Sequence, residues 1–207
     1  MNDIKVVVFD CDGVLFNTEK VNRMYYNQIL NHFGMQDITP GQFAYAQMHT
    51  VDKALANIFE DIEQLEAVQE YRSKMDYLPF IKYMQIEPCL KLLLKWLKPK
   101  FKTAIATNRS DTMDHVLAEH DLEEDFNLVV TALDVANPKP HPEPLLKILE
   151  YFKIAPRNAI YVGDSKLDET AAMAAGIPLI AYDNKSLSAD FHITSLKEIE
   201  TILENID

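Results

Sequence analysis

The segment IKVVVFDCDG, residues 4–13, decides the fold. It opens with a mostly β-branched, apolar run that ends at Asp10, the pattern of a strand buried on both faces. Asp12 follows two residues later, and Gly13 permits a sharp turn at this strand end. Paired carboxylates repel each other and lose hydration unless a cation compensates them. The motif alone is weak evidence, because turns also use aspartate and glycine freely.

The second half of the chain alternates between strand and helix patterns. Helices of about ten residues between buried strands imply right-handed crossovers, so the expected fold class is α/β with a doubly wound parallel, Rossmann-like sheet. Such sheets bind ligands at the carboxyl ends of their strands, which draws attention to Asp10, Thr107 and Asp164. We expect strands at 101–106, 128–131, 159–162, 178–182 and 190–193, and helices at 89–98, 111–120, 144–152, 167–175 and 196–206.

A helical insert separates the first strand from this alternating part. Thr18 offers an N-cap, and apolar residues then recur at four-residue spacing up to Gly34, as on an amphipathic helix. Helical patterning continues to about residue 87, with Pro40-Gly41 as a break and no convincing strand. The expected organisation is a core of residues 1–15 and 88–207 and a helical domain of residues 16–87.

The composition excludes several classes of protein. The 207 residues carry a formal charge of −12, from 32 acids and 20 bases, which argues against general nucleic-acid binding. A small anionic substrate remains possible, because a metal ion and a lysine can invert the local sign. No signal-peptide or membrane-spanning pattern appears, so we expect a cytoplasmic protein without a membrane partner.

A second acidic cluster lies in GDSKLDE, residues 163–169, directly after the strand pattern of residues 159–162. Each residue has a structural explanation, with Asp164 or Ser165 as an N-cap and Asp168 and Glu169 as acids in a first helical turn. Two acidic clusters on neighbouring strand ends are less easily explained by capping. Together they make a plausible site for Mg²⁺, which prefers oxygen ligands.

Two further segments carry groups suited to an oxyanion. Thr107 and Asn108 end one strand pattern and precede a helix, where a hydroxyl, an amide and backbone N–H groups could bind it, although, taken alone, helix capping explains them better. Lys139 lies in the proline-dense segment 137–144 and could balance phosphate charge. The alternative for Lys139 is a solvated loop lysine.

These four features occur in a fixed order, and in this order they resemble a known family. DCDGV at 10–14, Thr107-Asn108, Lys139 and GDSKLD at 163–168 look like the motifs of the haloacid dehalogenase superfamily of phosphohydrolases. Within it, the chain is similar to the phosphoglycolate phosphatase and β-phosphoglucomutase branch. The resemblance covers nearly the whole chain, and residues 16–87 fall where that branch has a helical cap domain.

The resemblance implies a covalent mechanism. The residue that matches Asp10 forms an aspartyl-phosphate, and Asp12 protonates the leaving alcohol and then activates water. Asp12 also favours a phosphatase over a dehalogenase, because an alkoxide leaving group needs a proton. The implied Mg²⁺ ligands are Asp10, the backbone carbonyl of Asp12, and Asp164, with Asp168 ordering the site. The implied phosphoryl contacts are Thr107, Asn108 and Lys139.

Some positions depart from the family's pattern or carry weaker expectations. Asn17 stands where many relatives have aspartate, and Arg109 stands where lysine is frequent; neither is expected to be central to the chemistry. The candidate substrate contacts in the insert are polar residues around an expected cap loop, although an isolated histidine there is more often a surface residue. They are Gln47, His49, Thr50 and Lys53.

Three functions remain open at this point. The leading one is hydrolysis of a small phosphate monoester by a monomer or dimer. The second is a sugar phosphomutase that uses the same residues. The third is a binding or regulatory protein on a catalytically silent scaffold, which would be expected to have lost Asp10, Asp12, Lys139 or Asp164; none is lost.

Overall fold

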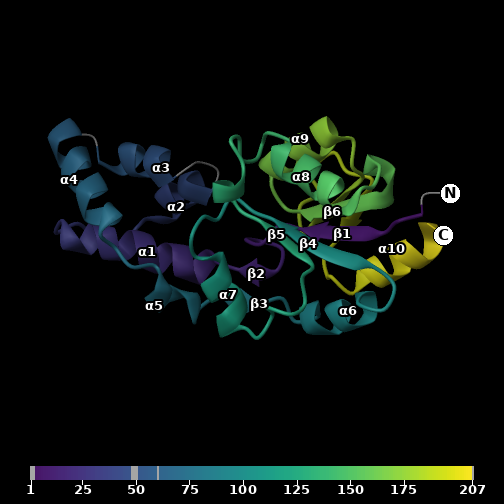
Figure 1. The fold of residues 1–207 in the computed structure, drawn as a ribbon. Helices are drawn as coiled ribbons and strands as arrows, with labels where there is room; N and C mark the ends of the chain where they lie inside the picture. Colours follow the sequence, from purple (N-terminus) through teal and green to yellow (C-terminus); the bar gives the residue numbers. More distant parts are fainter. Residues whose placement is uncertain (1–2, 48–50, 60, 207) are drawn as a thin grey trace. The chain divides into compact units, whose positions relative to one another are not determined.

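The fold is built around a parallel sheet with β1 at its centre (Figure 1). The computed structural model describes residues 3–47, 51–59 and 61–206. The six strands have the order β5-β4-β1-β6-β7-β8, and each neighbouring pair is parallel. Their bounds are β1 Val6–Phe9, β4 Lys102–Ala106, β5 Leu128–Val130, β6 Ala159–Gly163, β7 Leu179–Tyr182 and β8 Phe191–Ile193. The predicted α/β fold class is therefore confirmed.

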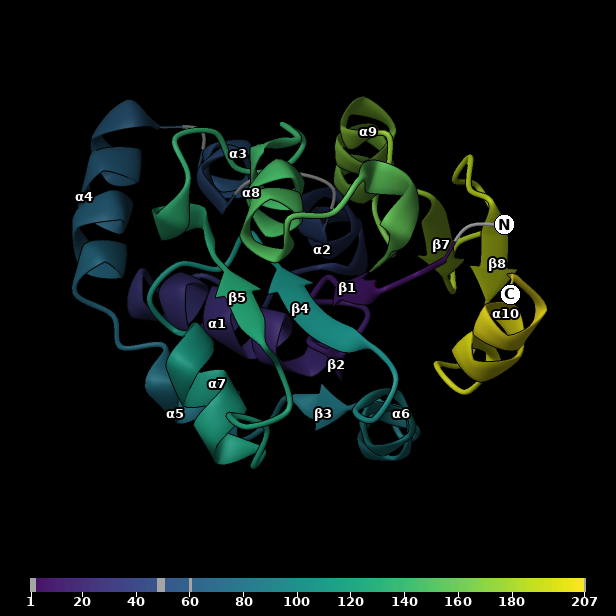
Figure 2. The same cartoon turned by 45° about the vertical axis from the view of Figure 1, so that its right-hand side comes forward.

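Helices cover both faces of this sheet. Figures 1 and 2 show α8 and α9 on one face and α6 and α10 on the other. Because both faces are covered, all four residues of β1 are buried, which explains its uninterrupted apolar sequence. The helices are α6 Leu90–Leu97, α7 Met113–Glu119, α8 Glu143–Phe152, α9 Lys166–Ala175 and α10 Glu198–Ile206, with 3₁₀ turns at Ala132–Asp134 and Pro156–Asn158.

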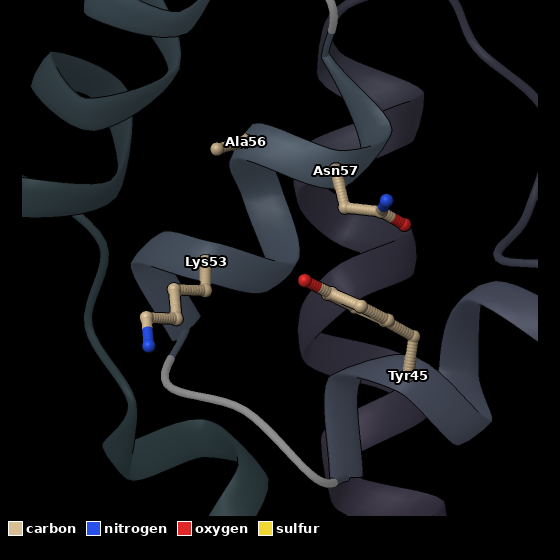
Figure 3. A pocket seen from close by; sticks show the side chains of 4 residues that line it. All are labelled: Tyr45, Lys53, Ala56 and Asn57. Carbon is tan, nitrogen blue, oxygen red and sulfur yellow. The ribbon is translucent and has the colours of Figure 1, made fainter.

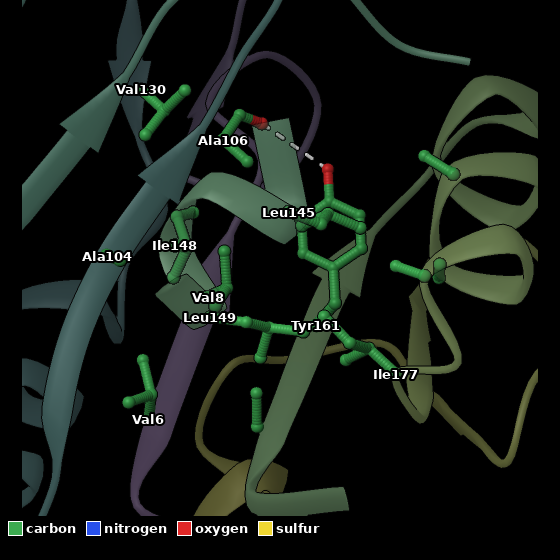
Figure 4. Close-up of a cluster of buried hydrophobic side chains, with 14 of the residues drawn as sticks. Val6, Val8, Ala104, Ala106, Val130, Leu145, Ile148, Leu149, Tyr161 and Ile177 are labelled. Atoms are coloured by element: carbon green, nitrogen blue, oxygen red, sulfur yellow. Dashed lines mark hydrogen bonds between the residues drawn. The ribbon is translucent and has the colours of Figure 1, made fainter. Parts of the chain in front are cut away.

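One hydrophobic cluster fixes α8 and α9 against the sheet (Figure 4). Val8 of β1 and Ala106 of β4 lie beneath Leu145 and Ile148 of α8. The Tyr161 ring of β6 is buried in the same cluster, and its hydroxyl lies at the carboxyl end of the strands. The packing therefore holds α8 and α9 against β1, β4 and β6 on one face of the sheet.

A short antiparallel ladder was not expected from the sequence. β2 (Phe16–Asn17) pairs with β3 (Gln85–Ile86), although the pattern up to residue 87 suggested no strand. Each strand is two residues long, which is too short to display an alternating pattern. The ladder joins the two points at which the chain leaves and re-enters the sheet-containing part.

The chain divides into two compact units. One contains the residues up to Asn17 and from Gln85 onward, and the other is Thr18–Met84. The second unit has its own hydrophobic core, which includes Ile29, Phe43 and Leu55. Its helices are α1 Glu19–His32, α2 Pro40–Gln47, α3 Val51–Ile58, α4 Ile62–Ser73 and α5 Leu78–Ile81.

Two local expectations for the helical unit need correction. Thr18 occupies the N-cap position of α1, but its side chain makes no capping hydrogen bond and instead accepts one from the Asn22 amide. Pro40-Gly41 lies in the first turn of α2, where proline is tolerated because no helical hydrogen bond is needed from its nitrogen.

In the part of the chain that the structure describes, no helix has the length and apolar character needed to cross a membrane.

Candidate active site

The predicted residues meet at the carboxyl edge of the central strands. Phe9 of β1 is in register with Ile105 of β4 and Val162 of β6. Asp10 follows β1 directly, and the segments that begin at Thr107 and Asp164 follow β4 and β6. Parallel pairing therefore brings three segments that are distant in sequence to one edge, where ligands of such sheets bind.

Three carboxylates form a compact cluster at this edge. Asp10, Asp164 and Asp168 each offer an oxygen, and these oxygens lie within 4.8 Å of one another. Burial raises the pKa of Asp10 well above its usual value of 3.8, and burial and the Asp168 charge raise that of Asp164 to about 7. A bound cation would favour the ionised forms. Clustered carboxylate oxygens are the donors that Mg²⁺ prefers, so these residues fit such an ion.

Lys139 supplies the positive charge inside the cluster. Its Nζ donates to Asp10 Oδ1 at 2.7 Å, to Asp168 Oδ1 at 2.7 Å and to the Tyr161 hydroxyl at 2.9 Å. Its side chain is 3% exposed, so the alternative of a solvated loop lysine is wrong. Burial opposes its charge, but Asp10 and Asp168 outweigh burial and raise the pKa of Lys139. The lysine is therefore held as a cation between two carboxylates.

Asp168 is fixed by hydrogen bonds from several sides. Its Oδ1 accepts from Lys139 and, at 2.6 Å, from the Tyr161 hydroxyl; its Oδ2 accepts from the Ser165 backbone at 3.0 Å and hydroxyl at 2.5 Å. Burial opposes ionisation, but Lys139 and these hydrogen bonds lower the pKa of Asp168 overall. Ser165 is the N-cap of α9 and forms a capping box with Asp168, so the structural explanation of Ser165 is confirmed.

Glycine is required beside Asp168. A β-carbon added at Gly163 would overlap the Asp168 side chain. The last residue of β6 therefore leaves room for the buried carboxylate.

Thr107 and Asn108 have different surroundings. Thr107 is 1% exposed, and its hydroxyl accepts from the Arg109 backbone N–H at 3.1 Å. The Asn108 amide donates to the Lys139 carbonyl at 2.9 Å and accepts from the Lys139 N–H at 3.0 Å. The Asn108 side chain thus fixes the backbone of the lysine loop, whereas the family resemblance predicted a contact with a phosphoryl oxygen.

Asp12 is bound by Arg109, which was not expected to be central to the chemistry. Arg109 Nε and Nη2 donate to Asp12 Oδ2 and Oδ1, both at 2.7 Å, and its Nη1 donates to the Thr112 hydroxyl at 3.2 Å. The Arg109 side chain is 9% exposed. An arginine three positions beyond a strand end, at the ligand-binding edge, was the available signal. Tyr161 was also missed, because it lies inside an apolar run that suggested only packing.

The candidate contacts in the helical unit are placed only in part. Gln47 ends α2 and Lys53 lies on α3, both exposed, whereas His49 and Thr50 lie outside the described residues. Lys53 lines a pocket of about 470 Å³ together with Tyr45, Ala56 and Asn57. Figure 3 shows the Tyr45 ring extending from α2 toward α3, which carries the other three residues. The pocket offers a hydroxyl, an amine and an amide.

Comparison with known proteins gives consistent matches over most of the chain. A pyrophosphatase PpaX of Bacillus pumilus (strain SAFR-032) is 30% identical over 178 residues, covering 84% of this chain and 80% of that protein. A phosphoglycolate phosphatase of Aquifex aeolicus (strain VF5) is 28% identical over 175 residues, covering 84% and 82%. The crystal structure of a HAD-superfamily hydrolase, subfamily IA, variant 1, from Geobacter sulfurreducens PCA has a TM-score of 0.88 and 36% identity, covering 97% of each chain.

The family model described as haloacid dehalogenase-like hydrolase matches residues 7–182, a span that contains all of β1 except Val6, the lysine loop and the acidic start of α9. The expected resemblance is therefore confirmed over the residues that build the carboxylate cluster: the chain belongs to the haloacid dehalogenase-like hydrolase family.

Proposed function

We propose that the protein is a Mg²⁺-dependent phosphatase that hydrolyses a small phosphate monoester through an aspartyl-phosphate on Asp10. The observation that carries this proposal is the buried cluster in which Lys139 binds Asp10 beside Asp164 and Asp168. The names of the similar pyrophosphatase and phosphoglycolate phosphatase favour a small phosphorylated metabolite as the substrate.

Asp10 is the nucleophile in this proposal. One carboxylate oxygen attacks phosphorus while the bond from phosphorus to the leaving oxygen breaks, and Asp12 gives that oxygen a proton. A water oxygen then attacks phosphorus, Asp12 takes a proton from the water, and the bond to Asp10 breaks. The Asp10 Oδ1 contact with Lys139 limits rotation of the carboxylate, so its orientation toward phosphorus is set before the substrate binds.

Two of the three carboxylates would bind the metal ion, and the third would hold the surrounding residues in place. Asp10 and Asp164 would hold Mg²⁺ with the backbone carbonyl of Asp12, because the Asp168 oxygens already accept hydrogen bonds from Lys139, Tyr161 and Ser165. When bound, the cation supplies charge compensation for the phosphoryl oxygens. Lys139 and the Thr107 hydroxyl would contact those oxygens, and Asn108 would hold Lys139 in place.

We propose that the helical unit acts as a cap domain that recognises the leaving group of the substrate. The pocket beside Lys53 would give it polar contacts, since Tyr45 and Asn57 line the same space. A cap that excludes water would strengthen the electrostatic interactions at the reacting phosphate.

The test is phosphate release by the purified full chain from an aryl phosphate, 2-phosphoglycolate, pyrophosphate and hexose phosphates. We expect turnover with Mg²⁺, its loss in excess chelator and its return when Mg²⁺ is restored in excess. Release that survives complete chelation would contradict the proposal. Conversion of one hexose phosphate to its isomer without free phosphate would instead support the sugar phosphomutase.

The raised pKa of Asp164 predicts an unusual dependence of stability on pH. Its carboxyl binds protons more readily in the folded state, where its pKa is about 7 against an ordinary 3.8, so the free energy of unfolding of the metal-free protein should fall as pH rises through this window. The pKa of Asp168 is lowered, so this residue changes the free energy of unfolding only at pH values below that window. We expect a melting temperature about 4–8 °C higher at pH 5.5 than at pH 7.5 with chelator, for roughly 2 kcal/mol.

Two comparisons isolate this effect in thermal melts. Mg²⁺ should flatten the pH dependence, because a bound cation favours the ionised carboxylates. Asp164→Asn should reduce the slope without metal and leave the part that the raised pKa of Asp10 contributes. A metal-free wild-type protein that becomes more stable between pH 5.5 and pH 7.5, with Asp164→Asn showing the same slope, would contradict the prediction.

A further inference from the structure

The Arg109–Asp12 pair is built as a fixed recognition element. Among the residues that the structure describes, Asp12 accepts hydrogen bonds from two guanidinium nitrogens and Thr112 from the third. The backbone on either side of the side chain is also fixed, because Arg109 N donates to the Thr107 hydroxyl and Arg109 O accepts from the Ala132 N–H at 2.9 Å. A side chain so extensively held has a defined position before any substrate binds.

This position is on the leaving-group side of the site. In the proposed function Asp12 contacts the leaving oxygen, so the guanidinium bound to Asp12 lies next to the leaving portion of the substrate. Both Asp12 oxygens accept hydrogen bonds from Arg109, but Asp12 must carry a proton to act as the acid, and a neutral carboxyl no longer balances the charge of the guanidinium. The guanidinium then needs another acceptor in its place.

The charges around Arg109 indicate that this new acceptor is an anionic group of the substrate. Lys139 is shared by Asp10 and Asp168, so it is already opposed by two carboxylates. The surrounding carboxylates would repel a second negative charge on the substrate unless another cationic side chain bound that charge. Arginine binds carboxylate and phosphate groups with two parallel hydrogen bonds, the geometry that Arg109 already uses on Asp12.

We propose that Arg109 recognises a negatively charged oxyanion on the leaving portion of the substrate, a carboxylate or a second phosphate, by exchanging Asp12 for that group. The proposal rests on the proposed function, because the leaving portion lies beside Arg109 only if Asp12 contacts the leaving oxygen. It narrows the substrate class to phosphate compounds whose leaving portion is itself an anion.

The test compares substrates that differ in this second charge. 2-Phosphoglycolate and pyrophosphate carry the second anion, as a carboxylate and as a phosphate; 2-hydroxyethyl phosphate and methyl phosphate lack it. We expect the wild type to prefer at least one anionic compound by tenfold or more in kcat/KM at fixed free Mg²⁺. Arg109→Gln should lower kcat/KM for that compound by roughly 10–100-fold, mainly through KM, and should lower it by a smaller factor for the neutral esters, which make no ion pair with the guanidinium.

Two further variants separate recognition from folding. Arg109→Lys, which keeps the charge and loses the fork, should retain part of the preference. Arg157→Gln removes an exposed arginine from the 3₁₀ turn before β6, at the opposite strand end, and should leave all four substrates unchanged. Melting temperatures of all variants establish that they are folded.

The outcomes distinguish the inference from the proposed function. A wild type without preference for either anionic compound, or an Arg109→Gln variant that slows all four substrates by the same factor, would overturn Arg109 as a recognition residue. Failure of the proposed function would appear as no phosphate release from any compound. Arg109 can then be tested without turnover, by calorimetric dissociation constants of the same four compounds on Asp10→Asn and on the Asp10→Asn, Arg109→Gln double variant. The single variant should bind an anionic compound more tightly than the neutral esters, and the double variant should lose this preference.

Discussion

Replacing Asp10 by asparagine should lower kcat by roughly 10⁴-fold or more, because the amide cannot form the aspartyl-phosphate and loss of a nucleophile removes the whole covalent route. The substitution keeps the shape of the side chain. Lys139 keeps its contact with Asp168, so the folded state should not be weakened. The measurement is steady-state phosphate release, with the melting temperature recorded on the same samples.

The matched control for this variant is Asp121→Asn. Asp121 is exposed after α7, and its φ of 55° lies in the left-handed region, which asparagine also adopts readily. It should have wild-type activity and stability. An Asp10→Asn protein that keeps more than about one hundredth of the wild-type kcat would contradict a nucleophilic role, since that residual exceeds what loss of a covalent route leaves.

Replacing Lys139 by methionine should have the largest effect on stability. Methionine leaves Asp10 and Asp168 buried without the cation that both contact at 2.7 Å. Removing one partner of a buried ion pair typically costs about 3–5 kcal/mol. We expect a loss of this size in the free energy of unfolding from urea titration without metal, together with near-complete loss of turnover. Lys95→Met, at an exposed position of α6, is the control and should change neither.

A double variant tests the cause of that loss. If the cost arises from the unpaired carboxylates, Asp10→Asn with Lys139→Met should be more stable than Lys139→Met alone, because one of the two charges is gone. Equal stability of the single and double variants would show that Lys139 contributes by packing. A loss below about 1 kcal/mol in Lys139→Met would contradict the buried ion pair itself.

The sheet and the meeting point of the site residues could be predicted from the sequence because both depend on patterns along the chain. A strand buried on both faces is apolar throughout, as Val6–Phe9 is, and its end is marked by the first charged residue. Parallel pairing then forces the ends of β1, β4 and β6 to one edge. The predicted placement of Asp10, Thr107 and Asp164 followed from topology without any knowledge of side-chain positions.

The pairings within the site could not be predicted, because they join residues that are far apart in sequence and depend on side-chain conformation. Arg109 and Asp12 are separated by 97 positions. The proline-dense segment around Lys139 has the composition of a solvated loop, yet Asn108 holds its backbone so that the side chain enters the cluster. The two-residue strands β2 and β3 were missed for a different reason, since so short a segment carries no periodicity.

The central claim is that a phosphoryl group is bound covalently to Asp10 during turnover. The most direct measurement is an acid quench of the wild-type protein during turnover of a substrate that carries radiolabelled phosphate, followed by hydroxylamine treatment and identification of the labelled peptide. We predict acid-stable, hydroxylamine-labile label on the peptide that contains Asp10, and none on the Asp10→Asn protein. Turnover without label on the wild type, or equal label on Asp10→Asn, would contradict the account.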